Sequence, residues 1–167
     1  MSYVQKRHRS CLKSKAAKKL ALEIFEEFGI KMEQFFESKV RVESYEIDAF
    51  TVFLFNSKPL LAKTNNTLFF TLIFQEIFSQ IPKIVVDMGA VPYVCKGADV
   101  MAPGVKEVQG NFVENGLLLI VDERHGQPLA VGSAMFDSEE LKNVQRGKTI
   151  RNIHYVGDKL WDSLKAS

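Results

Sequence analysis

Glycine and phenylalanine divide this chain at Pro82. Eleven of the 13 phenylalanines lie before Pro82 together with one glycine, Gly29, whereas nine of the ten glycines lie after it. Aromatic side chains supply large apolar areas to a core, and glycines are typical of tight bends between short strands. The sequence therefore predicts an α+β protein of two units: residues 1–82, with an aromatic core, and residues 83–167, built from strands and turns.

The positive charge of the chain is concentrated near its N terminus. Seven of the 22 Lys and Arg residues lie within the first 22 positions, where there is no acid, although the net charge is only +2. Lys15, Lys18 and Lys19 occupy the start of a predicted helix, where the helix dipole disfavours cations. This basic arm predicts an anionic partner, and a solvated tail that serves solubility is the alternative.

Residues 1–82 are predicted to contain two helices and several strands. Apolar residues recur at helical spacing over 17–28 and are followed by Gly29, a residue typical of helix C-caps. A second helix is expected from the Asn65-Asn66-Thr67 caps to the residue before Pro82. Alternating or apolar runs predict strands at 39–45, 51–55 and 60–63.

Residues 83–167 are predicted to form short strands and one helix. The helix is expected to begin at an Asp137 or Ser138 cap and to end at Gly147. Many short strands with glycine at most bends predict a small closed or nearly closed barrel. The expected strands lie at 84–86, 100–101, 117–122, 128–134 and 153–156.

The stretch VDMGAVPYVCKGADVMAPGV, residues 86–105, is the most informative in the chain. Its pattern predicts a strand, a glycine turn, a short helix, a second glycine turn and another strand. Gly89, Gly97 and Gly104 can adopt positive φ and allow another backbone to approach closely. We expect main-chain N–H groups around the short helix to be accessible to phosphates or sugars, although a barrel needs such bends in any case.

This stretch closely resembles the opening of the PUA domain, named after pseudouridine synthase and archaeosine transglycosylase. Residues 128–132 resemble the buried strand of that domain, and residues 147–148 and 152–161 resemble its ending. The ending, together with an N-terminal domain of this length, is most similar to the malignant T-cell-amplified-sequence family of translation-associated proteins. The resemblance implies an N-terminal helix-and-strand domain packed on a PUA-type β pseudo-barrel.

The resemblance also implies a function: binding of structured RNA, tRNA or ribosomal RNA, in translation initiation or recycling. The partners it implies are the small ribosomal subunit and a further protein. Lys148 and Arg151 form a second basic group, for which a solvent-facing helix end is the alternative explanation. Carried over by position, the RNA-binding surface comprises Lys96, Gly97, Ala98, Asp99, Met101, Pro103 and Gly104, with Lys106 nearby.

The sequence gives no sign of catalysis or of a cofactor. No spacing of Cys, His, Asp and Glu predicts a metal site, and the two cysteines are expected to be reduced thiols. A hairpin turn explains His125, which follows two acids, and His154 is predicted to be a hydrogen-bonded structural histidine. No apolar run is long enough to span a membrane. With no catalytic pairing of residues and with reduced thiols, a noncatalytic, cytoplasmic protein is expected.

Three other functions remain open at the level of sequence. The chain could be an RNA-binding accessory subunit of an RNA-modifying enzyme whose catalytic domain is another polypeptide. It could be a small hydrolase that uses Asp122, His125 or His154. It could also be a protein adaptor that uses the phenylalanine-rich unit and leaves RNA untouched.

Overall fold

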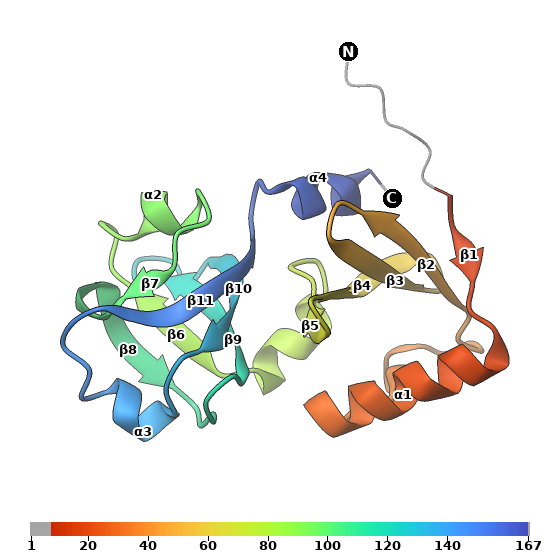
Figure 1. Ribbon diagram of the computed structural model, residues 1–167, viewed down its shortest axis with the longest axis horizontal. Coiled ribbons are helices and arrows are strands. Elements are labelled where there is room, and N and C mark those ends of the chain that lie inside the picture. Colours follow the sequence, from red (N-terminus) through yellow and green to blue (C-terminus); the bar gives the residue numbers. More distant parts are fainter. Residues whose placement is uncertain (1–7, 167) are drawn as a thin grey trace, which may run out of the picture. The chain divides into compact units, whose positions relative to one another are not determined.

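The computed structural model describes residues 8–166, which form two compact units. The first unit runs to Glu76 and is joined by the residues from Ser163 onward, and the second unit is Ile77–Asp162. Each unit has a sheet of its own, as Figure 1 shows. The predicted α+β class is confirmed.

The first unit combines a helix with a five-stranded antiparallel meander. The helix α1, Ser14–Phe28, ends as predicted at Gly29, which has φ = 67° and donates its N–H to Phe25 O at 2.8 Å. A 3-10 turn, η1, Met32–Phe35, follows. The strands are β1 Ser10–Cys11, β2 Val42–Ile47, β3 Phe50–Phe55, β4 Lys58–Thr64 and β5 Thr67–Phe70.

Aromatic side chains fill the core of this unit, as the sequence predicts. Phe69, Phe70 and Phe74 are fully buried. Phe70 packs edge-on against Phe28 of α1, and Phe74 packs in the same way against Phe35.

Among the described residues, no helix is long and apolar enough to cross a bilayer.

The prediction of a second helix before Pro82 is wrong. Its place is taken by the strand β5 and by a 3-10 segment, η2, Gln75–Gln80. Asn65 and Asn66 both have positive φ, 47° and 63°, so they form the two-residue turn of a β-hairpin between β4 and β5 rather than a helix cap. The apolar residues after the turn form a strand that is buried on both faces of the sheet. In sequence, a continuous apolar run of this kind cannot be distinguished from a buried helix.

The second unit is a six-stranded mixed sheet, strongly curved in Figure 1. Its strand order is β7-β11-β10-β9-β6-β8, and β6 and β9 are the parallel pair. All five predicted strands are present, although β11 begins earlier than expected, and the polar edge strand β8 was not predicted. The strands are β6 Lys83–Val86, β7 Val100–Met101, β8 Val105–Gln109, β9 Leu117–Asp122, β10 Pro128–Ala134 and β11 Lys148–Tyr155.

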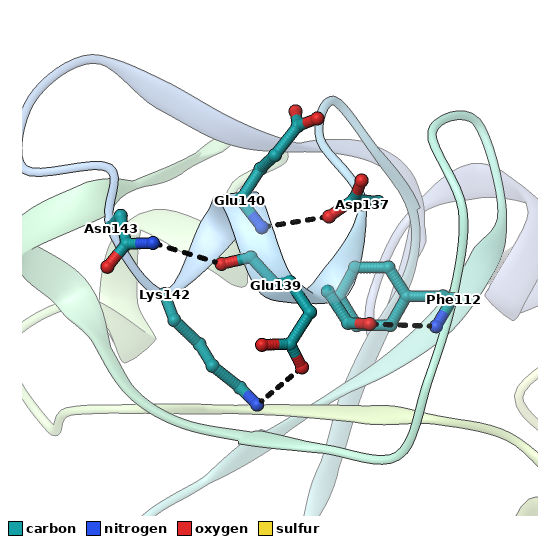
Figure 2. Close-up of polar contacts among 7 residues, drawn as sticks. Phe112, Asp137, Glu139, Glu140, Lys142 and Asn143 are labelled. Carbon is teal, nitrogen blue, oxygen red and sulfur yellow. Dashed lines mark hydrogen bonds and ion pairs between the residues drawn. The ribbon is translucent and has the colours of Figure 1, made fainter.

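The helix expected to end at Gly147 is shorter than predicted. This helix, α3, Ser138–Leu141, is capped by Asp137, whose Oδ1 accepts the Glu140 N–H at 2.8 Å (Figure 2). After α3 the Asn143 N–H donates to Glu140 O, a bond between residues three apart that closes a tighter turn. The Asn143 side chain also reaches Glu139 O at 3.5 Å, so this polar residue favours a helix end.

Candidate functional site

The short helix expected in the glycine-flanked segment is α2, Val91–Val94. Pro92 lies in its first turn, where a missing N–H costs no hydrogen bond. Just before the helix, Asp87 Oδ1 accepts the Ala90 N–H at 2.8 Å. After the helix, Gly97 adopts φ = 95° and directs the chain toward β7.

Main-chain N–H groups at the turn after α2 are already used inside the protein. Lys96 and Ala98 donate to Tyr93 O at 3.1 and 3.0 Å, and Gly97 donates to Val94 O at 3.0 Å. The expectation that these amides hold a phosphate is therefore wrong for residues 96–98. The amides of residues 96–98 are therefore not available to a ligand.

Asn152 of β11 fixes the α2 segment against the sheet. Its Nδ2 donates to Val94 O and to Ala98 O, both at 3.1 Å, and its main-chain N–H donates to Asp99 Oδ1 at 2.9 Å. These bonds join two segments that are more than fifty positions apart in the chain. The segment after α2 is consequently held against β11 by these hydrogen bonds.

A groove of about 670 Å³ lies between α2, the glycine turns on either side of it and the start of β11. Residue Lys148 enters it because it pairs with Met101 in the β11–β7 ladder. The groove is lined by Asp87, Gly89, Ala90, Tyr93, Val94, Gly97, Ala98, Asp99, Val100, Met101, Pro103, Gly104 and Lys148.

The groove combines exposed apolar surface with one cation. Tyr93 is 68% exposed and Met101 is 47% exposed. Among the described residues of the lining, Lys148 is the one positive side chain, and its Nζ lies 3.3 Å from Asp99 Oδ2. A flat ring can stack on an exposed tyrosine, and an ammonium can pair with an anionic group beside it.

The sequence and fold of this unit match known proteins. A family model described as the PUA domain matches residues 82–156. An uncharacterized protein of Methanocaldococcus jannaschii is 35% identical over 159 residues, which cover 93% of this chain and 96% of that protein. The chain belongs to the PUA-domain family. The family resemblance seen in the sequence is therefore confirmed.

Two named groups of PUA proteins are related over about half of their length. Translation machinery-associated protein 20 of Saccharomyces cerevisiae is 34% identical over 87 residues, 48% of each chain. Malignant T-cell-amplified sequence 1 of Rattus norvegicus is 32% identical over 84 residues, 46% of that protein. The crystal structure of a hypothetical protein from Pyrococcus horikoshii has a TM-score of 0.77 at 29% identity and covers 93% of this chain and 98% of that chain.

The structure brings some of the predicted site residues of the PUA unit together and leaves others apart. Lys96, Lys106 and Arg151 are exposed but lie outside the lining of the groove. Lys15, Lys18 and Lys19 are exposed on α1, in the first unit. The groove itself contains Gly97, Ala98, Asp99, Met101, Pro103, Gly104 and Lys148.

Tyr93 is a groove residue that the sequence pattern did not single out. It is 68% exposed, whereas Val94 is 1% exposed and belongs to the core of the PUA unit, with Val91 packed against that core. Val91 and Val94 are three positions apart and share the buried face of α2, so Tyr93 lies off that face. This spacing of the two valines was the signal that could have identified it.

The acidic pair before His125 serves the turn between β9 and β10. Asp122 accepts the N–H groups of Arg124 and His125 on Oδ1, at 2.9 and 2.6 Å, and that of Gln127 on Oδ2 at 3.0 Å. These bonds, that from His125 foremost, lower the pKa of Asp122 although its burial opposes the shift. The predicted hairpin turn is confirmed, and among the described residues no group of His, Cys, Asp and Glu could hold a metal ion.

His154 is the structural histidine that the sequence predicts. It is fully buried, and its Nδ1 lies 2.8 Å from Asp158 Oδ2. Burial by itself raises the pKa of Asp158, but the His154 contact and the N–H groups of Trp161 and Tyr155 bring it below its usual value. The pair fixes the end of β11 to the start of the last helix, α4, Lys159–Lys165.

Proposed function

We propose that this protein is a noncatalytic RNA-binding protein that contacts tRNA or ribosomal RNA during translation initiation or recycling. The observation that carries the proposal is the groove at α2, where Tyr93 and Met101 are exposed beside Lys148. Stacking of a base or ribose on an aromatic ring, next to a cation for the phosphate, is a common arrangement in RNA recognition. The yeast relatives are named translation machinery-associated proteins, which favours a role in translation.

The charge of the PUA unit also supports this surface. From residue 83 onward there are ten Lys and Arg residues against eleven Asp and Glu residues, so binding by charge alone is weak. The charges are unevenly placed: Glu139 and Glu140 belong to α3, which Asp137 caps and which lies at the opposite end of this unit from α2 in Figure 1. Lys96, two residues after the end of α2, and Lys148 in the groove are exposed cations near α2 with which a phosphate can pair.

Titration of tRNA and ribosomal RNA fragments with the full-length protein over a range of salt concentrations tests the proposal. Lys148→Met and Lys96→Glu are expected to weaken binding several-fold at low salt and to make its salt dependence shallower. Lys142→Gln, an exposed lysine on the α3 side that pairs with Glu139, is the matched control and is expected to bind like the wild type. Equal affinities for all four proteins would remove the groove as the RNA-binding site.

The alternative of an accessory subunit for an RNA-modifying enzyme makes a different prediction. Because its catalytic domain would be another polypeptide, the protein purified from its source would carry a modification activity that the recombinant chain alone lacks. Assay of both preparations for modified nucleotides distinguishes this alternative from a role in translation. The two share the RNA-binding groove, so the substitutions above do not separate them.

A further inference from the structure

Asp99 uses its two carboxylate oxygens for different purposes. Oδ1 accepts the Asn152 N–H at 2.9 Å, whereas Oδ2 lies 3.3 Å from Lys148 Nζ. An asparagine has one oxygen that can accept the same N–H group, so anchoring the segment to β11 requires an acceptor but no charge. The negative charge of Asp99 therefore acts on Lys148.

Lys148 is also the cation on which phosphate binding in the groove depends. The described lining of the groove contains two carboxylates, Asp87 and Asp99, and this one lysine. The side chain of Lys148 is 61% exposed and that of Asp99 is 25% exposed. A phosphate that reaches the ammonium group has to compete with a carboxylate that already lies beside it.

We infer, on the basis of the proposed RNA-binding function, that Asp99 is a built-in competitor of phosphate for Lys148 and sets the RNA affinity of the groove. When a phosphate pairs with Lys148, Asp99 loses its partner, so the free energy of the Lys148–Asp99 pair is subtracted from the free energy of binding. The groove binds a bare phosphate chain poorly, so an RNA must make further contacts, such as stacking on Tyr93, to be retained.

Asp99→Asn is the substitution that tests this inference. It keeps the acceptor for Asn152 and removes the charge, so the fold is retained while Lys148 is released. Exposed ion pairs of this kind contribute up to about 1 kcal/mol, so the affinity for a tRNA transcript is expected to rise about two- to fivefold at low salt.

Asp87→Asn is the matched control, because it removes a second carboxylate from the same groove. Asp87 Oδ1 accepts the Ala90 N–H at 2.8 Å, and asparagine keeps an acceptor there too. If only the total charge of the groove mattered, the two substitutions would raise affinity equally. We expect Asp99→Asn to have the larger effect, and we expect the excess to disappear when both substitutions are made in a Lys148→Met background.

The outcomes separate this inference from the proposed function. Weaker binding by Lys148→Met, with Asp99→Asn no better than Asp87→Asn, would overturn the role of Asp99 and leave the groove as an RNA site. No change in any variant, Lys148→Met included, would overturn both. Thermal unfolding completes the set: Asp99→Asn is expected to unfold like the wild type, and Asp99→Ala, which loses the acceptor, at a lower temperature.

Discussion

Gly97 shows how one residue determines the shape of the candidate site. Its φ of 95° is unfavourable for any side chain, and a Cβ atom at this position would lie 2.9 Å from Cε1 of Tyr155. Tyr155 is partly buried and packs against the core of the PUA unit, so its ring cannot move freely. The tight turn after α2 therefore requires both the conformational freedom and the small size of glycine.

Gly97→Ala is expected to lower the stability of the PUA unit more than Gly157→Ala does. Gly157 is a matched control because it has φ = 96° but no atom within 4 Å of an added Cβ. The unfavourable φ costs about 1–2 kcal/mol in both variants, and displacement of the Tyr155 ring is expected to cost about 1–3 kcal/mol more in Gly97→Ala. Urea unfolding followed by the fluorescence of Trp161, the one tryptophan, measures both. Equal losses of unfolding free energy in the two variants would show that the Tyr155 ring moves aside without destabilising the protein.

Asp122 stabilises the β9–β10 turn through its charge, so its contribution is expected to depend on pH. Its pKa in the folded protein is below its usual value, with the His125 amide as the main cause. The carboxylate therefore adds stability above the unfolded-state pKa of about 3.9, and this stability is lost as the pH falls through the lower, folded-state pKa.

Comparison of Asp122→Asn with the wild type at pH 7 and near pH 3 tests this dependence. At pH 7 the variant is expected to have a lower free energy of unfolding, because the amide has one accepting oxygen for the Arg124, His125 and Gln127 N–H groups. The difference between the two proteins is expected to shrink at the lower pH, where the Asp122 carboxyl group of the unfolded wild type is protonated. A difference that stays constant over this range would show that only the shape of the side chain matters.

At the level of secondary structure, two-residue turns organise the sheet of the first unit. Asn56 and Ser57 join β3 to β4 with φ values of 50° and 70°, and Asn65 and Asn66 join β4 to β5 in the same way. Positive φ at both central residues is the conformation whose twist matches that of a hairpin. These turns set the register that places Phe69 and Phe70 in the core.

Asn66→Val is expected to destabilise the first unit by about 1–2 kcal/mol, because a β-branched residue is strained at φ = 63°. Asn66→Gly is expected to be neutral or slightly stabilising, since glycine favours this position of the turn. Thr67→Val, one residue further on and exposed at the start of β5, is the control and is expected to have little effect. Thermal unfolding followed by circular dichroism ranks the stabilities of the three variants. An Asn66→Val protein as stable as Thr67→Val would contradict the strained position of residue 66.

For the whole molecule, we propose that both units contact RNA. The exposed lysines of α1 are suited to phosphate contacts, but removal of residues 1–19 would delete β1 and the first turns of the helix. Charge substitutions on the intact fold are therefore the better test of this surface.

Combined replacement of Lys15, Lys18 and Lys19 by Gln is expected to weaken RNA binding at low salt and leave it nearly unchanged at high salt. Each lysine–phosphate pair that the substitutions remove makes the slope of log K against log salt shallower by about 0.7–0.9. An unchanged slope, in RNA titrations where Lys148→Met is shallower, would identify the α1 lysines as a solvated surface that serves solubility.

The local chemistry of the sequence determined much of this fold. The helix before Gly29, the turn around Asp122 and the short helix within residues 86–105 each depend on neighbouring residues, and each was predicted correctly. Of the three glycines in residues 86–105, Gly97 adopts positive φ, whereas Gly89 and Gly104 do not. These signals suffice because a cap, a turn or a short helix is stabilised by groups close together in the chain.

Only the tertiary structure decided what depends on distant segments. The buried run after Asn66 became a strand because β4 offered it a partner, and periodicity cannot show such a partner. Some fifty positions from Gly97, Asn152 fixed the segment after α2 to the sheet, and Lys148 completed the lining of the groove. Hydrogen bonds and ion pairs between residues so far apart exist only after the sheet has formed, so local sequence patterns do not encode them.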